Sequence, residues 1–186
     1  VAPPPQAEVV PAEGLLAVPG FIDLQINGGF GLDFTADPGS IPTLARRLPQ
    51  FGVTAFLPTI VTAPPAVTRQ ATEVVRALPA DAPGAMVLGL HQEGPFLNPE
   101  QSGAHTPAHL RPPSLQTLAE MGPLDAVRLF TLAPELPGAC AVIAELVRQG
   151  IVVSAGHTSA SYEDALHALD QGLRFGTHLF SVMTPL

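Results

Sequence analysis

Short apolar runs alternate along the chain with longer segments in which apolar residues recur with helical spacing. A short run that ends in Gly, Asn, Pro or His predicts a strand, and the helical spacing predicts an amphipathic helix. Strands are predicted over Phe21–Ile26, Thr54–Pro58, Met86–His91, Ala126–Leu132, Ile151–Ala155 and Arg174–His178. Helices are predicted over Ser40–Phe51, Pro64–Leu78, Ser114–Met121, Gly138–Gln149 and Ser161–Gln171.

This alternation indicates a parallel sheet whose strands are joined by right-handed crossovers. Val87–Leu90 and Ile151–Val153 are continuously apolar, as expected for strands of a sheet that is covered on both faces. A doubly wound sheet and a (β/α)8 barrel both satisfy the pattern. We favour the barrel, because the turn Asn27–Leu32 after the first strand lacks the G-x-G-x-x-G spacing of a dinucleotide-binding fold.

A closed barrel has eight strand–helix units and typically about 250 residues, whereas this sequence has 186 residues. About six units are visible, so we predict an α/β protein with an incomplete TIM-type (β/α)8 barrel. The first and last strands would be unpaired edges. We therefore expect that these residues alone do not form a stable monomer.

Composition narrows the choice of partner and compartment. The chain is 46% hydrophobic and 13% charged, and no apolar run approaches the length of a membrane span. Its net charge is -8 and its eight basic residues, all Arg, form no basic stripe, so we expect neither nucleic acid nor a membrane as partner. The single Cys140 cannot form an internal disulfide, and no export signal is visible, which favours a cytoplasmic protein.

Candidate metal ligands lie at the carboxyl ends of three of the predicted strands, at the face where barrel enzymes place their sites. Glu93, His157 and His178 form a Glu/His/His set that suits a catalytic zinc ion with three protein ligands and one open position. A histidine at a strand end is more often a structural hydrogen-bonding residue. Glu93 has the stronger case, because an ionised carboxylate after an apolar strand needs a compensating cation.

Other histidines leave alternatives open. His91 shares a strand face with Glu93 and is as readily a packed neighbour as a partner of the site. His105 and His109 lie in a loop rich in Gly, Pro and Asn, where a histidine is either solvated or in contact with substrate. His167 falls on a predicted helix and is expected at the surface.

Several blocks of sequence resemble one enzyme family in their order and spacing. The blocks are Pro19–Gly28, Gly89–Asn98, Gly103–His105, Thr131–Glu135, Ser154–Thr158 and Thr177–Phe180. They resemble the N-acetylglucosamine-6-phosphate deacetylases of the amidohydrolase superfamily, over residues 15–186.

The resemblance implies a (β/α)8 barrel of the metal-dependent hydrolase kind beside a small β domain. Residues 1–18 would be a proline-rich lead-in with a remnant of that β domain, and residues 19–186 would be the partial catalytic barrel. It also implies that Glu93, His157 and His178 bind the metal, and that Ala104 and His105 contact the substrate.

The resemblance further bears on how many metal ions bind. Many amidohydrolases carry H-x-H on the first strand for a second metal, and Gln25 and Asn27 occupy those positions here. Amide side chains are poor ligands for transition metals. We therefore expect one divalent ion, with Zn²⁺ favoured and Fe²⁺ or another divalent ion as alternatives.

One block departs from the family pattern. The family usually reads T-H-L-F/Y-N-A-M, in which Asn and Ala contact the sugar phosphate, and Ser181 and Val182 stand at these positions here. Both are kept as substrate-binding candidates with altered chemistry. The family's phosphate-binding Arg and its catalytic Asp, the general acid and base, are expected beyond Leu186.

The activity that the resemblance implies is metal-dependent hydrolysis of N-acetylglucosamine 6-phosphate to glucosamine 6-phosphate and acetate, a step of amino-sugar catabolism. The full-length enzyme is expected to be a homodimer, and the 186 residues alone are expected to be inactive. Two alternatives stay open. One is an amidohydrolase of the same fold that acts on another amide, and the other is a non-catalytic barrel fragment.

Overall fold

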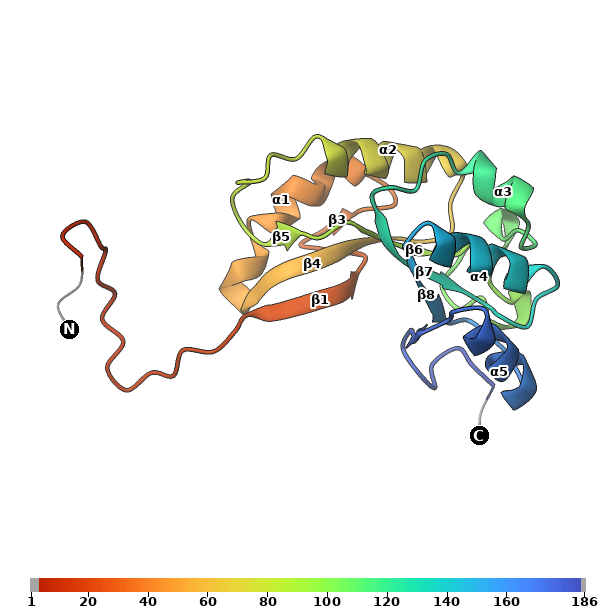
Figure 1. Cartoon of the computed structure of the whole chain (residues 1–186). Coiled ribbons are helices and arrows are strands. Elements are labelled where there is room, and N and C mark those ends of the chain that lie inside the picture. The colour runs from red at the N-terminus through yellow and green to blue at the C-terminus, as the bar shows by residue number, and fades with distance from the viewer. Residues whose placement is uncertain (1–3, 185–186) are drawn as a thin grey trace.

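The computed structural model describes residues 4–184 and shows a curled parallel sheet with helices on its outer side (Figure 1). Every strand pair along the sheet is parallel. The strand order is β1 (Phe21–Ile26), β4 (Val53–Ile60), β6 (Leu90–Glu93), β7 (Val127–Leu132), β8 (Val152–Ala155) and β9 (Phe175–Gly176), and β5 (Met86–Val87) pairs beside β4. The incomplete barrel predicted from the sequence is thus confirmed.

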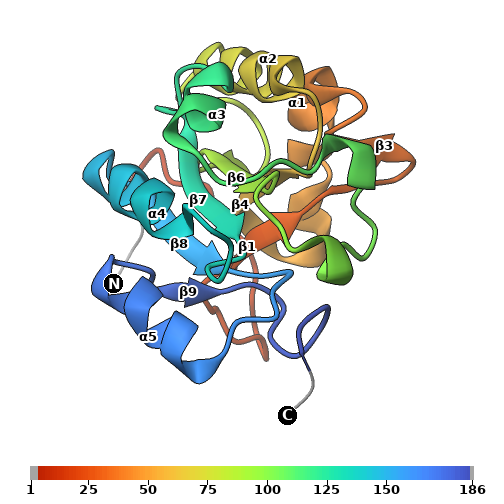
Figure 2. The same ribbon diagram turned by 90° about the vertical axis from the view of Figure 1, so that its right-hand side faces the viewer.

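The helices form an outer layer around this arc of strands (Figure 2). They are α1 (Ile41–Ala45), α2 (Pro65–Arg76), α3 (Leu115–Glu120), α4 (Ala139–Arg148) and α5 (Tyr162–Asp170). A small antiparallel hairpin, β2 (Gly28–Gly29) with β3 (Leu32–Asp33), follows β1. No described helix is long and apolar enough to cross a membrane.

The apolar core lies between the sheet and this helical layer. Phe56 of β4 and Phe130 of β7 are fully buried there, and Phe130 stacks on Phe96 with ring centroids 5.8 Å apart. Helix α4 packs Ile143 and Leu146 into the same core. Burial of this apolar surface is the main favourable term in folding, so the core holds the strands whose ends carry the site.

The predicted helix Ser40–Phe51 is wrong as a single element. Helix α1 ends at Ala45, and a separate 3-10 turn covers Leu48–Phe51. Pro49 has no N–H to donate to the carbonyl of Ala45, and its ring crowds that carbonyl, so an α-helix cannot continue. The Ala45 carbonyl instead accepts the N–H of Ala85 at 2.8 Å.

The predicted strand Met86–His91 is also divided. Strand β5 pairs with β4, and β6 begins again at Leu90. Gly89 between them has φ 140°, and a Cβ there would lie 2.6 Å from the carbonyl oxygen of Ala126. Only glycine adopts this bend without a clash, which lets the chain enter β6 with His91 and Glu93 facing inward.

The lead-in shows no helix or strand over residues 4–20, and it runs away from the sheet (Figure 1). Residues 1–3 lie outside the described residues. The division of the chain at residue 18, with a remnant of a small β domain before it, stays a prediction.

Candidate metal centre

The three predicted ligands meet at the carboxyl edge of the sheet. Glu93 is the last residue of β6, and His157 and His178 follow β8 and β9. Glu93 Oε1 lies 3.1 Å from His157 Nε2 and 3.0 Å from His178 Nε2. One ligand atom from each of the three lies within 4.8 Å of the others. Glu93 and His157 are buried, and the His178 side chain is 30% exposed, so one side of the group is accessible.

The donor set fits a divalent cation. His157 Nδ1 lies 2.8 Å from the carbonyl oxygen of Gln101, which can only accept, so the ring proton sits on Nδ1. In the neutral ring, Nε2 then presents a lone pair to the carboxylate oxygen of Glu93. Two facing lone pairs repel unless a cation or a proton lies between them. Ligand atoms at about 2.0–2.1 Å from a tetrahedral ion lie roughly 3.3 Å apart, close to the distances of 3.1 and 3.0 Å from Glu93 Oε1 to the two imidazole nitrogens.

Electrostatics favour the charged form of Glu93. Burial alone would raise the pKa of this carboxyl, but without a metal ion the protons that the imidazoles of His105, His157 and His178 direct toward it outweigh burial and hold the pKa well below its usual range. Glu93 is therefore a carboxylate at neutral pH, which is the form that binds a metal ion.

Both histidines of the group have left-handed backbone. The φ angle is 52° at His157 and 31° at His178, and Phe180 and Val182 follow with 69° and 46°. This conformation is uncommon for residues other than glycine. It turns the chain sharply after β8 and β9, which directs both imidazoles across the edge of the sheet toward Glu93.

Glu135, to which the sequence assigned no role, holds the turn at His157. Its Oε1 accepts the N–H of Ser159 at 2.7 Å and the side-chain amide of Asn98 at 2.9 Å, and its Oε2 accepts the Thr158 hydroxyl. The N–H of Asn98 donates to the His157 carbonyl at 3.0 Å. One carboxylate thus ties the loop after β6 to the loop after β8. The available signal was its place in the loop that follows β7, at the same edge of the sheet as Glu93 at the end of β6.

His105 reaches the same site from the loop after β6. It is buried, and the N–H of Thr62 donates to its Nδ1 at 3.2 Å. The proton of the neutral ring therefore sits on Nε2, which lies 3.8 Å from Glu93 Oε2. The His105 and His157 rings meet edge to face with centroids 4.4 Å apart. His105 thus places an N–H donor beside the Glu/His/His group.

The other substrate-binding candidates lie at the mouth of the site. Ala104 and Ser181 are exposed, and Val182 is half-buried. A Cβ added to Gly103 would lie 2.9 Å from Val182 Cγ1 and 3.4 Å from the His157 ring. The segment that carries Ala104 and His105 therefore lies directly against Val182. The contacts of these residues with a substrate stay predictions.

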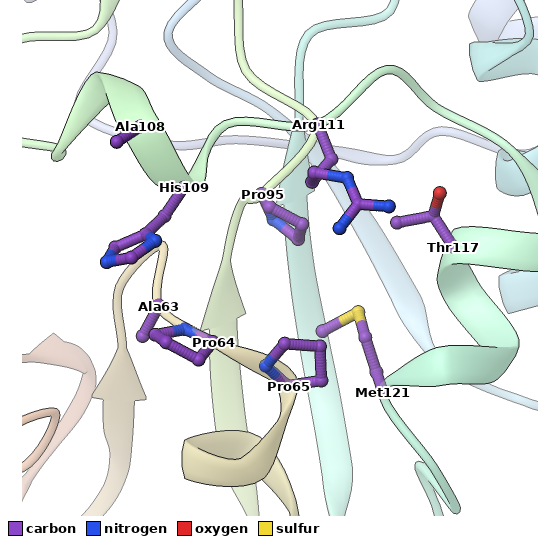
Figure 3. Close-up of a pocket in the computed structure, with 9 residues that line it drawn as sticks. All are labelled: Ala63, Pro64, Pro65, Pro95, Ala108, His109, Arg111, Thr117 and Met121. Atoms are coloured by element: carbon purple, nitrogen blue, oxygen red, sulfur yellow. The ribbon is translucent and has the colours of Figure 1, made fainter.

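The remaining histidines lie outside the group. His167 is exposed on α5. His91 lies below the site in the barrel interior, where burial lowers its pKa to about 4. His109 lines a separate cavity of about 200 Å³ between the loops that follow β4 and β6 (Figure 3). The cation of this cavity, Arg111, already lies 3.4 Å from Glu120 Oε2, so we assign no ligand to it.

A Glu/His/His group at the carboxyl edge of a parallel (β/α) barrel defines the class of metal-dependent hydrolases. Within that class, N-acetylglucosamine-6-phosphate deacetylase of Homo sapiens is 48% identical to this chain over an alignment of 180 positions, which covers 92% of this chain and 44% of the human protein. The chain is thus a homologue of the N-acetylglucosamine-6-phosphate deacetylases, and the resemblance seen in its sequence motifs is confirmed.

Two further comparisons agree with this relationship. N-acetylgalactosamine-6-phosphate deacetylase of Shewanella sp. is 40% identical over 91% of this chain and 43% of its own length. The crystal structure of the Thermotoga maritima N-acetylglucosamine-6-phosphate deacetylase matches 90% of this chain and 45% of its own, with a TM-score of 0.81 and 32% identity. This chain spans less than half the length of these relatives. No protein-family model matches it.

Proposed function

We propose that the protein carrying this chain hydrolyses the acetamide of N-acetylglucosamine 6-phosphate to glucosamine 6-phosphate and acetate. One divalent ion, Zn²⁺ in the first instance, would be held by Glu93, His157 and His178. The observation that carries the proposal concerns Glu93 and His157. The buried carboxylate of Glu93 lies 3.1 Å from His157 Nε2, and the ring proton of His157 is on Nδ1, where it is donated to the Gln101 carbonyl. The names of the homologues supply the substrate.

A divalent metal bound there would polarise the amide carbonyl and lower the pKa of a bound water toward about 7. The chain's own residues prepare the site for this chemistry. Gln101 fixes the ring of His157 with Nε2 toward Glu93. Because Glu93 and His157 are buried, bulk water is kept away from the side of the metal centre that they form, which strengthens their electrostatic interactions.

His105 is proposed to orient the substrate. Its Nε2–H is held in place by the hydrogen bond that Nδ1 accepts from Thr62. A preorganised donor aimed at an oxygen that gains negative charge stabilises the transition state. The general acid and base, an Asp in the family, is proposed to lie beyond Leu186.

The sugar phosphate is proposed to contact Ala104, Ser181 and Val182 at the mouth of the site. Ser181 and Val182 depart from the family pattern, and the Shewanella homologue is named for an N-acetylgalactosamine phosphate. These two observations favour one second candidate, an amidohydrolase of the same fold that prefers another N-acetyl hexosamine phosphate.

The test is acetate release by the full-length protein, measured on the 6-phosphates of N-acetylglucosamine and N-acetylgalactosamine. We expect the larger kcat/KM for the glucosamine compound. Removal of metal by a chelator should abolish the activity, and added Zn²⁺ should restore it. A larger kcat/KM for the galactosamine compound would select the second candidate. A folded, metal-loaded protein that hydrolyses neither compound would refute both and leave the non-catalytic reading.

We expect one metal ion per chain. Gln25 and Asn27 offer only amide oxygens where a second ion would need imidazoles, and the described residues contain a single candidate metal group. Elemental analysis of the full-length protein, after dialysis against metal-free buffer, measures this ratio. Two tightly bound equivalents per chain would contradict the expectation.

A further inference from the structure

The inner face of the sheet is arranged in three levels. Alternate residues of a strand point to the same face, so β7 directs Leu129 and Thr131 inward. At the lowest level, Leu129, Val152 and Phe175 line an apolar cavity of about 390 Å³. The highest level is the candidate metal centre. The middle level consists of buried polar side chains: His91, Thr131, Ser154 and Thr177.

The middle level forms one continuous chain of hydrogen bonds. His91 Nδ1 lies 3.1 Å from the carbonyl oxygen of Leu24, and its Nε2 lies 2.6 Å from Thr131 Oγ1. Thr131 Oγ1 lies 2.8 Å from Thr177 Oγ1, which lies 2.6 Å from Ser154 Oγ. These contacts join β1, β6, β7 and β8 to the residue that follows β9.

The donors of this chain can be assigned from chemistry. The Leu24 carbonyl can only accept, so His91 donates from Nδ1, and the neutral ring accepts at Nε2 from Thr131. Thr131 then accepts from Thr177, which accepts from Ser154. Thr131 is the central member, because it is both the donor to His91 and the acceptor for Thr177.

The hydroxyl chain lies in contact with the segments that carry the metal ligands. Thr177 directly precedes His178, and His91 lies two residues before Glu93. A Cβ added to Gly156, the residue before His157, would lie 2.6 Å from Thr131 Cγ2 and 3.2 Å from Thr177 Cβ. The backbone before His157 therefore rests directly on these two threonines.

We propose that the chain Ser154–Thr177–Thr131–His91 positions Glu93, His157 and His178 relative to one another, with Thr131 as its central positioning residue. The inference rests on the proposed metal centre. Buried polar groups that are fully paired fix one arrangement of the elements that carry them. Changes in groups that support metal ligands typically cost about 10–100-fold in metal affinity.

Thr131→Val tests this role, because it keeps the shape of the side chain and removes only its hydroxyl. We expect it to weaken Co²⁺ affinity about tenfold, the lower end of the range for supporting groups, and to alter the visible absorption spectrum of the bound Co²⁺. Thr131→Ser keeps the hydroxyl and should restore most of the affinity. Co²⁺ titration of the full-length protein measures the affinity and the spectrum of both variants, and denaturant unfolding measures their stability.

Thr72→Val is the matched control. Thr72 is a buried threonine on α2 whose hydroxyl has no hydrogen-bond partner among the described residues. The same substitution there should leave the Co²⁺ affinity and spectrum unchanged. Should Thr131→Val fail to fold, Ser154→Ala removes only the terminal donor and should give a smaller loss of the same kind.

The outcomes separate the two proposals. Wild-type protein that binds Co²⁺ no better than Glu93→Gln overturns the metal centre and the positioning role with it. Wild-type protein that binds Co²⁺, with Thr131→Val equal to it in affinity and spectrum but less stable, overturns the positioning role alone. A weakened affinity that Thr131→Ser restores and Thr72→Val does not reproduce supports it.

Discussion

Glu93→Gln is expected to remove the metal and to lower the rate of hydrolysis by about 10³-fold or more, because a metal-activated water is lost. The amide has the shape of the carboxylate but no charge to balance a cation. Folding should be retained, since the new –NH₂ group can donate to the nitrogens of His157 and His178, which lie 3.1 and 3.0 Å from Oε1. Metal content, turnover and cooperative unfolding are measured on the same preparation.

Glu145→Gln is the control for this substitution. Glu145 lies on α4 on the outside of the barrel, where it pairs with Arg148 at 2.7 Å. The Glu145→Gln substitution should change neither metal content nor turnover. If Glu93→Gln keeps its metal and its activity, Glu93 is a structural residue and the proposed centre is wrong.

His105→Asn is expected to lower kcat/KM by about 10²–10³-fold, as for loss of one preorganised donor, with the metal retained. The asparagine oxygen can replace Nδ1 as acceptor for the Thr62 N–H, which lies 3.2 Å from it. Asparagine has no group at the position of Nε2, so the donor beside Glu93 disappears. Metal analysis and steady-state kinetics of the full-length protein distinguish this result from loss of the metal centre.

His109→Asn is the matched control, because His109 lies in the same loop but lines the separate cavity (Figure 3). It should leave the kinetics unchanged. Unchanged kcat/KM in His105→Asn would contradict an orienting role, and loss of the metal would show that His105 supports the metal centre instead.

The convergence of Glu93, His157 and His178 at one edge of the sheet could be predicted from the sequence because it depends on one local property. Each lies at the carboxyl end of a predicted strand, and the carboxyl ends of parallel strands meet at one edge of a barrel. The break at Ala45 was also visible in principle, since Pro49 lies inside the predicted helix, but the apolar period there suggested continuity.

The supporting residues could not be predicted in this way. Thr131 and Thr177 are 46 residues apart, and their hydroxyls meet only through the register of β7, β8 and β9. Glu135 likewise acts on a loop 24 residues further along the chain. Nothing local in the sequence distinguishes these side chains from ordinary residues at strand ends, because their partners are set by the curvature of the sheet.

The left-handed residues at His157, His178, Phe180 and Val182 also bear on how such a site evolves. For a residue with a Cβ, this conformation costs roughly 1–2 kcal/mol, a large fraction of the stability of a typical domain. A sequence selected for stability alone would place glycine or asparagine there. Under the proposed function, stabilising substitutions at these turns should therefore be easy to find and harmful to activity, and the two imidazoles would mark where chemistry has been favoured over thermal robustness.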